Sequence, residues 1–169
     1  MSAAGTAVGQ ASSVDQSAAE QKLKLQSRMR GGAGWLMAVA IFSVLNSVLM
    51  MFDAKLHFIV GLGITQIADG VGKAGGTAGG VAGLVVTLIA AGVFVVFWKF
   101  AREGEHWAFL IGMILYGLDG LIFLGFGLWL DLAFHAFAIF NLYKGLGALK
   151  ALQELNRQPA GFARQPIVR

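Results

Sequence analysis

The sequence contains no cysteine, only two prolines and few charged residues. Without a thiol the chain cannot form disulfides, thiolate metal sites, a cysteine nucleophile or thioether-linked haem. Both prolines lie near the C-terminal end, where Gln158-Pro159 is expected to end the last helix. Charged residues make up 13% of the chain, whereas ordinary soluble domains contain roughly 25%. This composition is not that of a soluble domain.

Catalytic motifs are missing as well. The sequence holds no nucleophile elbow, HExxH zinc motif, P-loop or dinucleotide-binding fingerprint. A phosphate-binding glycine loop follows a β-strand, and no strand precedes the glycines at 61–63 and 70–83. We therefore expect a protein that is not an enzyme and that needs no cofactor.

Apolar residues, by contrast, are abundant, at 57% of the chain against roughly 45–50% in soluble domains. Nearly every side chain from Trp107 to Leu149 is apolar. About 20 residues are enough to cross a bilayer, so this stretch must turn back on itself. Glycines at 125 and 127 can loosen the helix, and Asp131 can cap the next one. The stretch predicts a transmembrane hairpin.

The complete pattern predicts an all-α integral membrane protein with four antiparallel transmembrane helices. The apolar segment at 56–69 is too short for an ordinary span, which favours an interfacial or re-entrant segment between the first two spans, with a fifth span as the alternative. Residues 1–21 are expected to be a flexible tail, and residues 70–83 either a loop or the start of a helix. The domains and spans expected are a cytoplasmic tail with a basic interfacial segment at 1–32, a transmembrane domain at 33–150 with spans at about 34–52, 81–101, 107–125 and 131–150, and a cytoplasmic C-terminal tail at 151–169.

Charge and aromatic residues predict the topology. Eleven of the 13 Lys and Arg residues lie on the side that holds both termini, so the positive-inside tendency places both termini in the cytoplasm. All four tryptophans fall at span ends, where amphipathic rings favour the interface. We expect a multi-pass protein of a bacterial cytoplasmic (inner) membrane, in which basic residues meet lipid and not nucleic acid. The predicted headgroup contacts are Lys22, Lys24, Arg28 and Arg30.

Asp119 is the most costly residue in the predicted spans. It lies 12 residues after Trp107, so roughly 18 Å along the helix and near the middle of the bilayer. Its carboxyl group must face protein or water. Tyr116 lies on the same helical face, and Asn46 and Asn141 have similar depth, so the four residues could form one intramembrane polar layer. This layer is either a structural clasp or part of a proton, ion or solute path.

The three histidines raise the question of a metal or haem. Only His57 and His135 are expected on the same side of the membrane, and neither stands in a repeated ligand motif. They are weak candidates for an outer metal site, which would also use nearby aspartates. We expect no metal and ordinary interfacial histidines.

The function predicted from the sequence is non-enzymatic. Glycine makes up 24 of 169 residues, and small residues inside apolar helices allow close helix packing. This favours a subunit or scaffold of a larger membrane complex, or a homo-oligomer. The alternative is a channel or transporter component with a proton- or ion-responsive layer around Asp119. A redox or metal protein is a third class.

Overall fold

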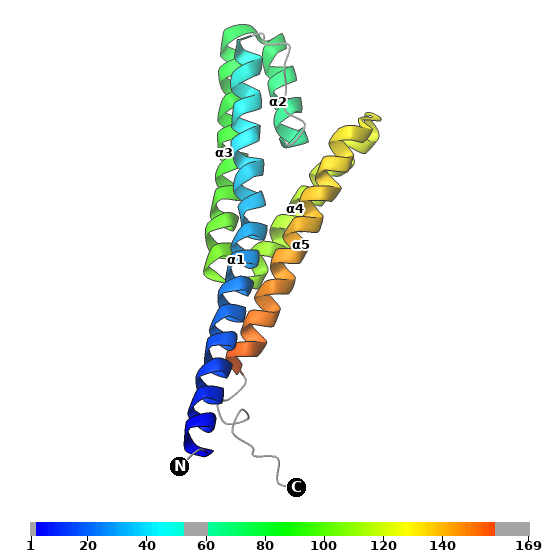
Figure 1. Cartoon of the computed structure of the whole chain (residues 1–169). Helices are drawn as coiled ribbons and strands as arrows, with labels where there is room; N and C mark the ends of the chain where they lie inside the picture. Colours follow the sequence, from blue (N-terminus) through cyan, green and yellow to red (C-terminus); the bar gives the residue numbers. More distant parts are fainter. Residues whose placement is uncertain (1–2, 53–60, 158–169) are drawn as a thin grey trace.

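The computed structural model describes residues 3–52 and 61–157, and its regular elements there are all α-helices (Figure 1). They are α1 (Ala3–Met51), α2 (Gly63–Ala74), α3 (Gly76–Glu103), α4 (His106–Gly125) and α5 (Trp129–Arg157). Four helices are long and apolar enough to cross a membrane: the Gln16–Met50 part of α1, and α3, α4 and α5. The predicted all-α fold is therefore confirmed, as is the prediction of four helices with the length and apolar character of membrane spans.

The first helix is longer than the sequence analysis expected. A flexible tail at 1–21 and a separate basic segment were predicted, but α1 runs without a break from Ala3 to Met51. Its polar first half contains Ala, Gln and Lys, which favour helix, and no proline that would stop it. In Figure 1 this half of α1 extends beyond the other helices.

The glycine-rich stretch at 70–83 is helical on both sides of a tight turn. It ends α2 at Ala74 and starts α3 at Gly76, whose φ of +69° is accessible to glycine at little cost. The two helices touch backbone to backbone, because a Cβ on Gly79 would lie 2.0 Å from the carbonyl oxygen of Gly72. Only glycine at these positions allows α2 to fold back closely along α3.

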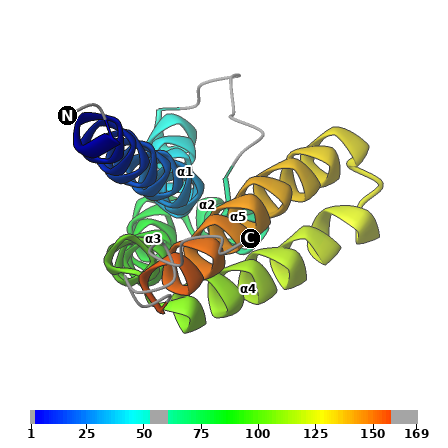
Figure 2. The same cartoon turned by 60° about the horizontal axis from the view of Figure 1, so that its bottom comes forward.

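The helices form an open bundle in which α1 packs against α3 and α5, and α4 packs against α5 and α3 (Figures 1 and 2). The connections within 103–129 are short: Gly104 ends α3 in the left-handed conformation, and Gly127, with a φ of +69°, lies between α4 and α5. Toward the upper end of Figure 1 the α4–α5 hairpin diverges from α1 and α3, and α2 lies there beside α3.

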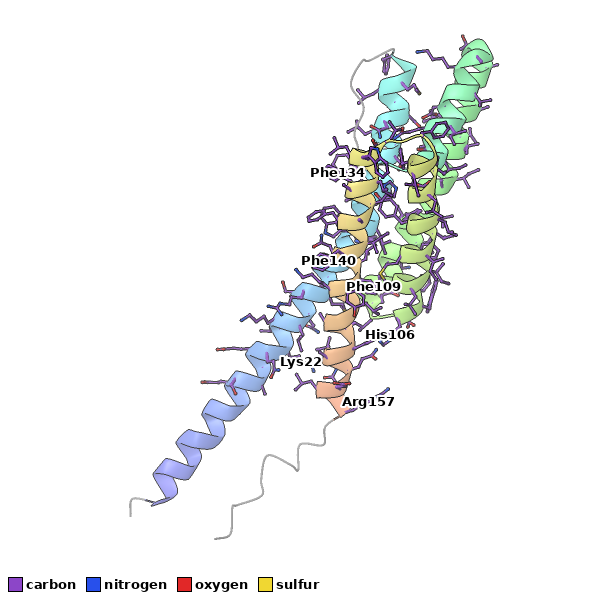
Figure 3. The ribbon with its side chains drawn as sticks, turned by 90° about the vertical axis from the view of Figure 1, so that its right-hand side faces the viewer. Lys22, His106, Phe109, Phe134, Phe140 and Arg157 are labelled. Carbon is purple, nitrogen blue, oxygen red and sulfur yellow. The ribbon has the colours of Figure 1, made fainter. Side chains whose placement is uncertain are left out.

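The start of α1 and the end of α5 lie at the same end of the bundle. In Figure 3, Lys22 and Arg157 lie toward this end, which we call the basic end, whereas Phe134 lies toward the other. The described Lys and Arg residues gather at the basic end, and only Lys73 belongs to the opposite one, where α2 meets α3.

Candidate functional site

The most unusual feature of the structure is that α2 begins inside the bundle. Leu62 and Ile64, at its start, line the same cavity as Ala90 and Phe94, which lie near the middle of α3. The first N–H groups of a helix have no partner within the helix. Leu62, the residue before the first turn, makes no side-chain capping hydrogen bond. The start of α2 therefore needs hydrogen-bond acceptors from other helices.

Asp119 on α4 supplies two of these acceptors. The amide of Gly63 donates to Oδ2 of Asp119 at 2.7 Å, and the amide of Ile64 donates to Oδ1 at 2.9 Å. The carboxyl group is almost fully buried. A carboxylate at a helix N-terminus is stabilised by both the amide hydrogen bonds and the positive end of the helix dipole. Asp119 thus acts as the N-terminal cap of a helix that lies far from it in sequence.

The first helix supplies further contacts to the same segment. The amide of Leu62 donates to Oγ of Ser43 at 2.9 Å, and the Ser43 hydroxyl donates to the carbonyl of Val39. Asn46 lies beside Gly61, where an added Cβ would come within 2.5 Å of its amide nitrogen. The entry into α2 is therefore enclosed by polar side chains of both α1 and α4.

His135 on α5 completes the site. Its Nδ1 lies 2.9 Å from the carbonyl oxygen of Asp131, and its Nε2 lies 3.1 Å from Oδ2 of Asp119. The imidazole stacks on Tyr116, with ring centroids 4.1 Å apart, and also contacts Phe123. His135 and Tyr116 are completely enclosed. The imidazole is therefore held in one orientation, with its Nε2 facing Asp119.

The hydrogen bonds determine where protons can lie in this pair. A carbonyl oxygen can only accept, so Nδ1 of His135 carries a hydrogen and donates to Asp131. Its Nε2 then faces Oδ2 of Asp119, and the hydrogen bond between the two side chains reduces the cost of burying the carboxyl group.

A second polar cluster lies between α1, α2 and α3 toward the end opposite the basic end. The hydroxyl of Ser47 forms a hydrogen bond with the carboxyl group of Asp69. Its oxygen also lies 2.7 Å from the hydroxyl oxygen of Thr87. Asp69 packs directly against Gly83, which has no side chain to obstruct it. Ser47 and Asp69 also line a cavity of about 290 Å³ together with Lys73. This cluster fastens the middle of α2 to both neighbouring helices.

The residues predicted for one polar layer are only partly gathered in the structure. Asp119 and Asn46 contact the chain where it enters α2, and Tyr116 stacks on His135 next to Asp119, but Asn141 does not join them. Its side-chain amide donates to the carbonyl of Phe137, and it lines a separate groove between α1 and α5. Asn141 therefore differs from the others in depth as well as in direction: its carbonyl lies beside Gly32 on α1, and Asn46 lies 14 residues, or roughly 21 Å, further along that helix.

Sequence reasoning did not identify the partners of Asp119. His135 was considered only as a weak metal candidate, and the backbone amides of Gly63 and Ile64 carry no signal in the sequence. The polar residues of α1, by contrast, carry a signal that the sequence shows. Ser43, Asn46 and Ser47 recur at helical spacing inside an apolar span, which indicates a helix face that contacts protein.

The predicted metal and headgroup residues can also be placed. His57 lies outside the described residues. In the described part of the chain, no group of three His, Asp or Glu side chains could hold a metal ion. The predicted headgroup residues lie exposed along α1 near the basic end: Lys22, Lys24, Arg28 and Arg30.

Together, the four long apolar helices and their buried polar contacts define the chain as an all-helical, multi-pass membrane protein. No protein-family model matches the sequence, and searches of curated proteins and of solved structures found no significant similarity.

Proposed function

We propose that this chain is a non-enzymatic membrane protein that works by packing its helices against another transmembrane helix, as a subunit or scaffold of a membrane complex or as a homo-oligomer. The observation that carries the proposal is a groove of about 550 Å³ between α1 and α3. Its lining is almost entirely apolar and includes Met37, Ile41, Leu45, Leu88, Gly92 and Val95. An apolar transmembrane helix has the chemistry to occupy it.

Gly92 makes this groove suited to a helix and not only to lipid chains. A Cβ added there would meet no atom of this chain within 4 Å, so the glycine is not needed for packing inside the bundle. Small residues exposed on a transmembrane helix allow a second helix to approach closely, which drives association in lipid. Other glycines, such as Gly32 and Gly79, are already used in contacts within the chain.

The geometry of Asp119 supports a structural role in the same proposal. Both carboxyl oxygens accept hydrogen bonds from amides at the start of α2, and Oδ2 also lies 3.1 Å from Nε2 of His135. A group engaged in this way holds α2 in register with α4 and α5. We infer that the site is a clasp that keeps the bundle in one shape for its partner.

We also propose the orientation and location of the protein. The basic end would face the cytoplasm, because Lys and Arg are retained on the cytoplasmic side of membrane proteins. Both termini would then be cytoplasmic, α2 would be a re-entrant segment that enters from the outer side, and the membrane would be the inner membrane of a bacterium.

Replacing Gly92 with leucine tests the packing function. We expect Gly92→Leu to fold normally, because the new side chain would extend into open space, but to lose most of its association with the partner helix. The measurement is gentle purification from native membranes, followed by identification of co-purifying chains and determination of the oligomer size.

Gly70→Leu is the matched control, because Gly70 also has open space around it and does not line the groove. A homo-oligomer would appear as a change in size, and a complex as loss of another chain. If the wild-type protein is a monomer without partners in its native membrane, or if Gly92→Leu associates as well as Gly70→Leu, the proposal is wrong.

A specific observation supports a second candidate, a channel or transporter component. Transporters often contain broken or half-length helices whose N-termini point at a polar site near the membrane middle. Here α2 is such a helix, and its N-terminus meets a hydrogen-bonded carboxyl–imidazole pair. The cavity beside Asp69 and Lys73 lies near the other end of α2. In this candidate, transfer of a proton to or from the pair would change the position of α2.

A flux assay with Asp119→Asn separates the two candidates. In reconstituted vesicles, a variant that folds and assembles normally but has lost proton or ion flux would support the path. Loss of assembly, with no flux in either the variant or the wild type, would support the clasp. The control is Glu103→Gln, which removes a carboxylate at an exposed position outside both polar clusters.

A further inference from the structure

A second groove, between α1 and α5 near the basic end, has a different character from the apolar one. Its volume is about 700 Å³, and its lining includes Arg28, Trp35, Asn141 and Lys144 but no carboxylate. Neither Arg28 nor Lys144 forms an ion pair with any residue in the described part of the chain. Among the residues that the structure describes, the two cations of the groove therefore have no carboxylate partner.

Glycines create this groove. A Cβ on Gly32 would lie 2.5 Å from Cα of Gly145, so α1 and α5 meet here backbone to backbone. Beside this contact, Gly31 and Gly147 line the groove, and a Cβ on either would meet nothing within 4 Å. The close contact determines the distance between the helices, and the two neighbouring glycines leave the space beside it empty.

The lining residues are ordered by depth. Arg28 lies one turn, or about 6 Å, from the glycine contact toward the basic end, and Lys144 lies next to that contact. Trp35 and Asn141 lie about one turn deeper. Trp35 meets the ring of Phe137 edge to face at 5.2 Å, and Nζ of Lys144 lies 5.4 Å from the ring of Phe140. Arg28 thus lies at the shallow end of the groove, and the ammonium of Lys144 reaches the deeper level of Phe140, beside the amide of Asn141 and the indole of Trp35.

We propose that this groove is a binding site for one anionic phospholipid. The phosphate would lie between Arg28 and Lys144, where a guanidinium can bind two phosphate oxygens at once. The glycerol region would lie beside Trp35 and Asn141, and the acyl chains would follow the exposed rings of Phe137 and Phe140 on α5. Basic pockets between transmembrane helices are typical sites for anionic headgroups.

The order of the groups distinguishes this site from general attraction to a charged surface. A diffuse attraction would depend on the number of basic residues and not on their position. Lys22 and Lys24 lie on the same helix as Arg28 but do not line the groove. If the site exists, removing two charges from the groove has a larger effect than removing two charges from the exposed helix.

The first experiment compares these two pairs in the full-length protein. Native mass spectrometry in detergent would measure the binding of phosphatidylglycerol and of phosphatidylcholine with the same acyl chains. Each basic residue near an anionic lipid contributes on the order of fivefold to affinity. We expect the Arg28→Gln, Lys144→Gln variant to bind phosphatidylglycerol about 25-fold more weakly, and the Lys22→Gln, Lys24→Gln variant to bind it within about twofold of wild type.

A second experiment fills the groove without changing charge. Gly31→Leu together with Gly147→Leu places side chains in the empty space, and Gly34→Leu is the control, since it also has open space but does not line the groove. We expect only the double variant to lose binding. Inorganic phosphate at millimolar concentration should not displace the lipid, because phosphate lacks the acyl chains.

The proposal is overturned if the two charge pairs weaken binding equally, if phosphatidylcholine binds as well as phosphatidylglycerol, or if the filled groove binds normally. Displacement by inorganic phosphate would also overturn it, in favour of a simple anion site. Because the glycine variants keep both cations, they test the site even if the charge variant fails to fold.

Discussion

Replacing Asp119 with leucine is expected to lower the free energy of unfolding by about 3–5 kcal/mol, the range for removing one partner from a buried, hydrogen-bonded pair of ionisable groups. The substitution would leave the amides of Gly63 and Ile64 without acceptors at the start of α2, and His135 without its partner. Unsatisfied backbone amides are especially costly in a membrane, where water cannot replace the lost acceptor. Asp119→Asn would retain one acceptor oxygen and should lose less.

The absence of cysteine allows a direct measurement of this effect. Thr65→Cys introduces a single thiol on α2 at a position that is 1% exposed. Its reaction with a maleimide should be slow in the otherwise native chain and at least tenfold faster when Asp119 is also leucine, because α2 would leave its position. Leu118→Ala, at the neighbouring exposed residue, should not change the rate. Equal labelling in all three backgrounds would show that Asp119 does not hold α2.

Replacing Gly145 with leucine is the second substitution with a large expected effect. A side chain there would collide with the backbone of Gly32, since a Cβ on Gly145 would already lie 2.8 Å from Cα of Gly32. Backbone atoms cannot move aside as a side chain can, so α1 and α5 must separate. We expect a loss of about 3 kcal/mol or more, at the upper end of the cost of overpacking.

Gly147→Leu is the matched control, two residues further along the same helix and with open space around its Cα. It should change the free energy of unfolding by no more than about 0.5 kcal/mol, which is typical of surface positions. The measurement is chemical unfolding in mixed micelles, followed by helical circular dichroism. If both leucines are tolerated equally, α1 and α5 do not pack at this glycine pair.

Some features of the bundle could be predicted from the sequence. The turn between the last two spans was predicted from the glycines at 125 and 127, and α4 ends at Gly125 while α5 begins at Trp129. Asp131 was expected to cap α5, but it lies within the first turn, where a carboxylate also interacts favourably with the helix dipole. Local signals of this kind depend only on nearby residues and can be read directly.

The partners of Asp119 could not be recognised in this way. Counting residues along each helix shows neither how the helices are shifted against one another nor the direction that a side chain faces in the bundle. His135 and Asn141 are six residues apart on α5, so they lie about 9 Å apart along the helix axis and point about 120° apart around it. Only the packing of α5 against α4 decides that His135, and not Asn141, faces Asp119.

By itself, the sequence determined that this protein has four helices long and apolar enough to span a membrane and that Asp119 must be buried among them, because length, hydropathy and the cost of charge in lipid depend on composition and order alone. The tertiary structure decided that α2 begins inside the bundle and is capped there by Asp119. A helix start carries no side-chain signal of its own when its acceptors come from other helices. Those acceptors exist only once α1, α4 and α5 have assembled around it.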